Sequence, residues 1–95
     1  MEIRQLTYFV ESARIRSFSE AARKLFTTQP NVSKAIKALE EELGVDLFYR
    51  KNTGIELTEE GKVVYLYAGN ILKNVDRMNL VLEERKANGN GGSEG

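Results

Sequence analysis

The side chains best suited to contacts with a partner gather in one short stretch of the sequence. Gln29 carries an amide that both donates and accepts, which matches the edge of adenine. Asn31 and Ser33 can hydrogen-bond a base edge or a phosphate, and Lys34 and Lys37 can neutralise phosphates. Taken singly, each residue is better explained as a solvated helix surface. Their convergence on one face and one end of a single helix favours contact with nucleic acid.

Chemistry of the catalytic kind is not indicated by the residue types. The chain contains no cysteine and no histidine, so it lacks thiolate ligands, the commonest general base and the commonest transition-metal ligand. No nucleophile–base pair and no phosphate-binding loop is recognisable. We therefore expect no enzyme, no cofactor and no metal site.

The charge pattern is neutral overall but uneven along the chain. Fourteen basic residues balance fourteen acidic ones among 95 residues. Between Arg14 and Lys37, however, six residues are basic and only Glu20 is acidic, which is either a footprint for phosphates or an ordinary solvated surface. The longest apolar run, 63–68, is too short to span a bilayer. A soluble cytoplasmic protein is expected.

Three helices are predicted in the first half of the chain. Leu6, Phe9, Val10 and Ala13 have the spacing of an amphipathic helix that ends near residues 14–17. Ser19 is the expected cap of a short second helix that reaches Leu25. A third helix is expected to start after an N-cap at Thr28, to tolerate Pro30 in its first turn and to end at Gly44. Its apolar stripe is Val32, Ala35, Ile36, Leu39 and Leu43.

A hairpin and a long helix are predicted in the second half. Residues 47–50 and 55–57 are rich in aromatic and apolar residues and flank the loop 51–54, so Arg50, Lys51 and Asn52 are expected at the hairpin tip. Thr58 is the predicted cap of a helix that starts at Glu59 and ends at about Lys86. Residues 87–95 have the composition of a flexible linker.

The last helix carries apolar residues at the 4, 3, 4, 3, 4 spacing of a coiled coil. This predicted dimerisation seam consists of Val64, Ala68, Ile71, Val75, Met78 and Leu82. The favoured interpretation is a homodimer held together by this helix. In the alternative, its first half packs on its own domain and the rest frays.

The order of these elements predicts a mainly helical fold, a winged helix-turn-helix followed by a long linker helix. We expect the winged domain over 1–58, its helix-turn-helix at about 18–37, the linker helix over 59–88 and a tail over 89–95. In such a domain the helix over 29–42 would lie in the major groove of DNA, with the wing at the minor groove.

Several motifs closely resemble the DNA-binding domain of LysR-type transcriptional regulators. They are Ser17-Phe18-Ser19-Glu20-Ala21-Ala22, the run from Thr28 to Ile36, the run from Leu39 to Arg50, and Leu57-Thr58-Glu59-Glu60-Gly61. The likeness extends from Met1 to about Leu72. Lys34 stands where the family commonly has arginine. The planar, bidentate guanidinium group of arginine is thus replaced by the single ammonium charge of lysine. Asn31 occupies a variable position.

The resemblance implies a function and a set of contacts. Base and phosphate contacts would be made by Thr28, Gln29, Pro30, Ser33 and Lys34, and a wing contact by Arg50 and its neighbours. Such regulators bind interrupted inverted repeats in promoter DNA as dimers or higher oligomers. They sense small-molecule effectors through a further domain, which these 95 residues do not contain, so we expect a DNA-binding fragment. The alternative is a winged-helix module that binds proteins.

Overall fold

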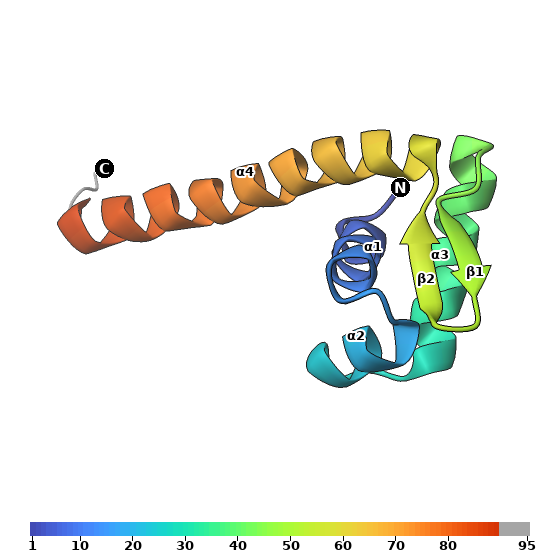
Figure 1. Cartoon of the computed structure of the whole chain (residues 1–95). Coiled ribbons are helices and arrows are strands. Elements are labelled where there is room, and N and C mark those ends of the chain that lie inside the picture. The colour runs from blue at the N-terminus through green and yellow to red at the C-terminus, as the bar shows by residue number, and fades with distance from the viewer. Residues whose placement is uncertain (90–95) are drawn as a thin grey trace.

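The computed structural model describes residues 1–89 and contains four helices and one hairpin in that range (Figure 1). In chain order the elements are α1 (Ile3–Ile15), α2 (Phe18–Lys24), α3 (Gln29–Leu43), β1 (Phe48–Lys51), β2 (Gly54–Leu57) and α4 (Glu59–Gly89). The predicted mainly helical winged helix-turn-helix with a long final helix is confirmed. None of the helices in residues 1–89 is long and apolar enough to cross a membrane.

The core lies where α1, α2 and α3 meet the hairpin. Phe9, Val32, Ile36, Leu39 and Leu47 are completely buried. They are large apolar side chains, each of which contributes about 1.5–3 kcal/mol when it is removed from water. This shared core holds the hairpin against the helices. A two-stranded hairpin alone would be only marginally stable.

The second helix begins two residues earlier than predicted. Ser17, not Ser19, is its N-cap, and the Ser17 hydroxyl accepts a hydrogen bond from the backbone N–H of Glu20 at 3.1 Å. Phe18 is buried, and its ring meets the ring of Phe48 edge-on at 5.4 Å between centroids. The first turn therefore forms around Phe18, and Ser19 is an exposed residue within the helix.

The third helix forms as predicted at both ends. The Thr28 hydroxyl accepts a hydrogen bond from the backbone N–H of Asn31 at 3.2 Å, and Pro30 lies in the first turn. Gly44 ends the helix with a φ of 73°, the left-handed conformation that glycine adopts without strain. Its last helical residue is Leu43, directly before the predicted cap and one residue beyond the segment 29–42 expected in the major groove.

The hairpin is tighter than predicted. Lys51 pairs with Gly54, so the turn contains only Asn52 and Thr53 instead of the expected four residues. Arg50 pairs with Ile55 inside the ladder and is not at the tip, which corrects its predicted position. A Cβ on Gly54 would lie 2.8 Å from the carbonyl oxygen of Arg16, so a larger residue would push the wing away from α1.

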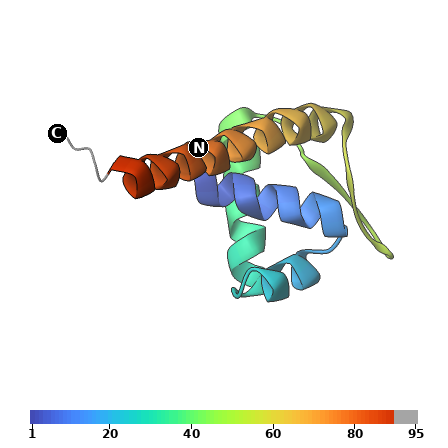
Figure 2. The same cartoon turned by 90° about the vertical axis from the view of Figure 1, so that its left-hand side faces the viewer.

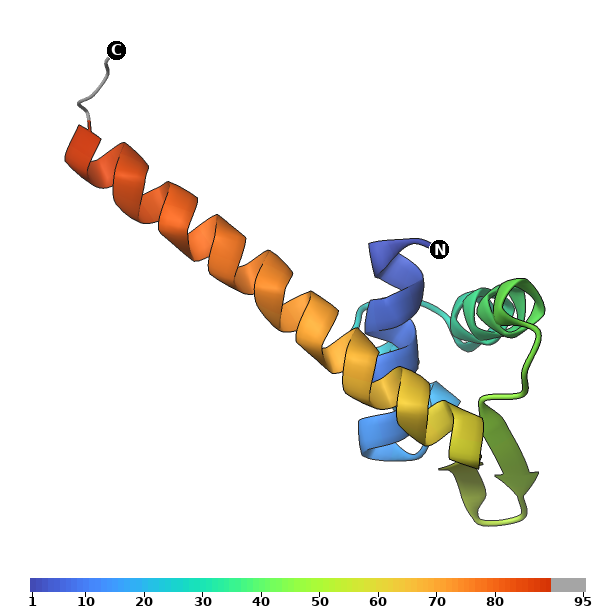
Figure 3. The ribbon, with the colours of Figure 1, turned by 90° about the horizontal axis from the view of Figure 1, so that it is seen from above.

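The final helix leaves the domain as a rod (Figures 1 and 3). The Thr58 hydroxyl accepts a hydrogen bond from the backbone N–H of Gly61 at 2.8 Å, which confirms the predicted cap. The helix continues to Gly89, one residue beyond the predicted range of 59–88, so residues 87–89 are helical despite their linker-like composition. The remainder of the predicted tail, 90–95, lies outside the described residues.

Part of the predicted seam belongs to the domain itself. Ala68 is only 1% exposed and Val64 is partly buried, and both pack with the core together with Leu72. The helix crosses over α1 at this point (Figure 2). These two residues therefore cannot form a free seam, whereas Ile71, Met78 and Leu82 are exposed and Val75 is half-buried.

Candidate nucleic-acid interface

The third helix presents the predicted polar side chains on the face opposite its core stripe. Val32, Ile36 and Leu39 are buried on one side. Thr28, Gln29, Pro30, Asn31, Lys34 and Lys37 are exposed, and Ser33 is half-buried. A helix of this kind can lie against a second molecule without disturbing its own packing.

Two hydrogen bonds arrange the polar groups at the start of α3. The amide nitrogen of Gln29 donates to the hydroxyl of Ser33 at 2.7 Å. The amide nitrogen of Asn31 donates to the hydroxyl of Thr27 at 3.1 Å. These contacts hold the two amides in place and leave the Gln29 carbonyl oxygen and its second N–H for a partner.

Fewer basic residues near α3 contribute an unpaired positive charge than the sequence indicates. Arg14 is paired with Glu11 at 2.6 Å and Arg23 with Glu20 at 3.1 Å. Lys34 and Lys37 have no ion pair among residues 1–89. Their charges add to the positive end of the helix dipole at the N-terminus of α3, which favours an anionic partner there.

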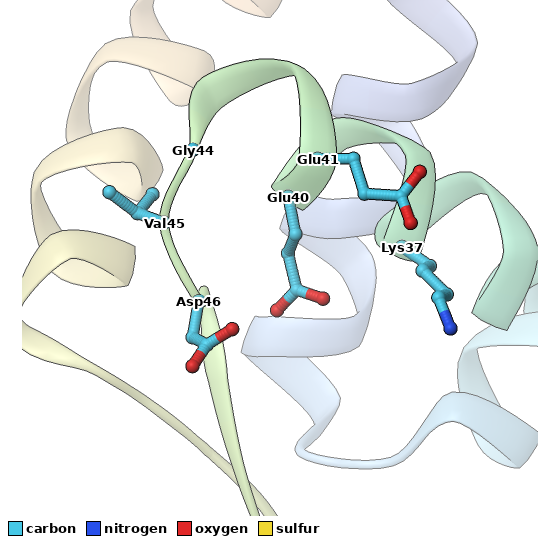
Figure 4. A pocket seen from close by; sticks show the side chains of 6 residues that line it. All are labelled: Lys37, Glu40, Glu41, Gly44, Val45 and Asp46. Atoms are coloured by element: carbon cyan, nitrogen blue, oxygen red, sulfur yellow. The ribbon is translucent and has the colours of Figure 1, made fainter.

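The opposite end of α3 is acidic. A hollow lies between this end and the segment that leads to β1, and it is lined by Lys37, Glu40, Glu41, Gly44, Val45 and Asp46. Figure 4 shows the three carboxylates around it. Because these groups would repel phosphates, the surface suited to nucleic acid runs from the start of α3 to Lys37 and does not include the end of the helix.

The wing, residues 48–57, brings its turn to the same end of the domain as the start of α3. Figures 1 and 2 both place the hairpin tip and the N-terminus of α3 on the side away from α4. Asn52 and Thr53 form the exposed tip. Both elements thus lie on the side of the domain away from α4, apart from each other in Figure 2, and this side could face a nucleic acid.

The two basic residues of the wing are both engaged within the protein. The guanidinium carbon of Arg50 lies 4.9 Å from the centre of the Phe18 ring. Lys51 forms an ion pair with Glu56 at 2.9 Å, and this contact lowers the pKa of the Glu56 carboxyl. The structure therefore brings Asn52 to the tip but holds Arg50 and Lys51 beside it.

Sequence reasoning missed three residues near this interface. Thr53 is one of the two turn residues of the hairpin, and a prediction of a two-residue loop would have placed it at the tip. Thr27 receives the Asn31 amide, a contact to which the sequence gives no clue. Phe26 is 97% exposed with a φ of 58°, in the turn between α2 and α3, and nothing in its residue type indicates that conformation.

The arrangement matches a known family of bacterial proteins. Residues 3–62 match the family model described as bacterial regulatory helix-turn-helix protein, lysR family. The chain belongs to this family. Curated relatives include the transcriptional regulator BenM of Acinetobacter baylyi, which is 46% identical over 78 residues, 82% of this chain. Another is the uncharacterised transcriptional regulator YwbI of Bacillus subtilis, 56% identical over 57 residues, 60% of this chain.

Solved structures show the same fold over nearly the whole chain. The crystal structure of the BenM DNA-binding domain with catB site 1 DNA has a TM-score of 0.88 and 39% identity and covers 99% of this chain and 100% of that one. The CbnR DNA-binding domain in complex with DNA has a TM-score of 0.82 and 38% identity, covering 92% of this chain and 98% of that one. The chain spans only 26% of the length of BenM and 19% of that of YwbI.

Proposed function

We propose that this chain binds double-stranded DNA sequence-specifically, with α3 in the major groove and the wing at the minor groove. The observation that carries the proposal is that the polar start of α3 and the wing tip are both exposed on the side of the domain away from α4. The DNA complexes of BenM and CbnR, which share the fold, support it. Regulation of transcription is the role that such binding would serve, in line with the names of the relatives.

Within this proposal the residues of α3 divide into two roles. Gln29 reads a base, because its amide can donate and accept at once, and Ser33 fixes its orientation through their hydrogen bond. Lys34 and Lys37 contact phosphates, which carry no base identity. Further contacts are assigned to exposed residues next to these on α3 or on the wing: Thr28, Pro30, Asn31, Arg50 and Asn52. Lys51, whose predicted contact would be at the wing, is paired with Glu56.

Selection of bound sequences from a random duplex pool tests the proposal. We expect enrichment of a defined sequence by the parent chain and loss of that enrichment in a Gln29→Ala, Lys34→Ala double variant. Because both side chains are exposed, the variant should remain folded. If the parent chain enriches no sequence and binds duplexes no better than the variant does, α3 is a surface for proteins instead.

We also propose that two copies pair through the outward face of α4. Exposed residues on this face have the spacing 4, 3, 4, 3 of a coiled coil, and we call them the outer seam: Tyr67, Ile71, Asn74, Met78 and Val81. The outer seam is rotated from the predicted one, since Val64 and Ala68 are occupied by the domain. Two domains joined in this way would bind the two halves of an inverted repeat.

A further inference from the structure

The two faces of the wing carry different side chains. Alternation along β1 and β2 puts Arg50 on the inner face with Phe48 and Ile55, both of which are buried. It puts Lys51 and Glu56 on the outer face, two pairs apart in the ladder, with the pair of Arg50 and Ile55 between them. Their charged atoms meet at 2.9 Å, and each side chain is about half exposed, at 51% and 48%. The outer face is therefore open to a partner that approaches the tip.

Neither cation of the wing is free to meet DNA without a change of contacts. Arg50 is held over the ring of Phe18, itself part of the core. Lys51 must leave Glu56 to reach a phosphate. Glu56 would then remain as a carboxylate without its nearest cation, beside the same phosphate.

We propose that Glu56 limits the affinity of this domain for DNA. It does so by holding the side chain of Lys51 in an ion pair beside the turn of the wing, away from the DNA phosphates. The proposal rests on the DNA binding proposed above and names a regulating residue within that site. At rest the wing offers DNA the uncharged side chains of Asn52 and Thr53. Those groups can hydrogen-bond the minor groove, but they release no counterions from the phosphates.

The strength of the pair is compatible with such a role. An ion pair between exposed side chains is weak, so DNA can open it. Opening it gains one phosphate contact but brings a negative charge close to the backbone. Arg16 and Lys62 also lower the pKa of the Glu56 carboxyl through their charges, after the larger effect of Lys51, so the carboxylate keeps its charge when Lys51 leaves. The net gain from Lys51 is therefore small as long as Glu56 is charged.

Three variants of the wing test this proposal: Glu56→Gln, Lys51→Gln and the two combined. We expect Glu56→Gln to steepen the slope of log affinity against log salt by about 0.9, the value of one phosphate contact. If the variant and the parent chain bind equally at 1 M salt, this difference in slope makes the variant bind roughly eightfold more tightly at about 0.1 M salt. Lys51→Gln should change the affinity of the parent chain less than about twofold, yet remove the entire gain in the Glu56→Gln background.

Glu59→Gln is the matched control, because Glu59 is also exposed and paired with a lysine, Lys62, but lies at the start of α4. If Glu59→Gln tightened DNA binding equally, the change in net charge alone would explain the effect, and the proposal would be overturned. It would also be overturned if Glu56→Gln binds no more tightly, or if Lys51→Gln costs the parent chain as much as it costs the variant. Failure of the parent chain to bind any duplex would instead refute the proposed function.

Discussion

The carboxylate of Glu40 on α3 accepts a hydrogen bond from the backbone N–H of Leu47, at 2.7 Å, just before the wing begins. A second contact lies alongside it, where the Thr58 hydroxyl donates to the carbonyl oxygen of Asp46 at 2.6 Å. The first bond connects the helix proposed to read DNA with the base of the wing, and the second joins the two ends of the wing. The position of the wing beside α3 is thus set by a directional bond as well as by apolar packing.

Loss of the Glu40 carboxylate should destabilise the domain. Glu40→Ala leaves the N–H of the buried Leu47 without its acceptor, so we expect the free energy of unfolding to fall by about 1–3 kcal/mol. Glu40→Gln keeps a carbonyl oxygen in nearly the same place and should lose less than half as much. Urea denaturation of both variants measures the difference. Equal losses would mean that the charge of Glu40, not its hydrogen bond, stabilises the fold.

Replacement of Phe26 should stabilise the domain. Its ring is 97% exposed and its backbone has a φ of 58°, a conformation that is strained for an aromatic residue. Relief of this strain in Phe26→Gly should exceed the extra entropy of glycine in the unfolded chain by about 0.5–1 kcal/mol. Thermal unfolding should show a higher midpoint. Lys24→Gly, within α2, is the control and should lower it; a lower midpoint for both would indicate that the Phe26 ring makes a stabilising contact.

The elements of this fold could be predicted because apolar spacing and capping residues mark most of them. Three residues mark the ends of α3 as the sequence predicts: Thr28 is its N-cap, Pro30 lies in its first turn and Gly44 is its C-cap. The predicted cap of α2, Ser19, is wrong, since serine stands at both 17 and 19 and Ser17 is the cap. Only the burial of Phe18 decides between them, and burial depends on the tertiary fold.

Other features could not be read from the sequence for physical reasons. Heptad spacing is the same whether a helix packs on its own domain or on a second copy, so Ala68 could not be assigned. The position of Arg50 depends on the length of the hairpin loop, and residues 51–54 are compatible with loops of two or four residues. The contact roles proposed for Gln29 and Lys34 remain predictions.

Disruption of the outer seam should separate the proposed dimer. We expect Met78→Asp with Val81→Asp to sediment as a monomer at concentrations at which the parent chain is dimeric. Affinity for an inverted repeat should fall by about 10²-fold or more, because the second half-site is no longer tethered to the first. Both residues are exposed, at 54% and 49%, so the domain should stay folded.

Leu80→Asp is the control for that experiment. Leu80 is 60% exposed and lies about 200° around the helix from Met78, at about 100° per residue. The control variant should remain dimeric. Dissociation by Leu80→Asp alone, with no effect of the double variant, would place the interface on the other side of α4.

Reading of bases and anchoring to phosphates should be separable within α3. Gln29→Ala removes an amide that both donates and accepts, so it should cost about 1–3 kcal/mol on the preferred operator and relax the preference at one base position in each half-site. Lys34→Ala removes a group that can only donate, and it should weaken binding to all sequences similarly while reducing the salt slope by about one. Titration of both variants against the operator and its single-base variants measures the two effects. A uniform loss for Gln29→Ala, or an altered base preference for Lys34→Ala, would reverse the roles proposed for these two side chains.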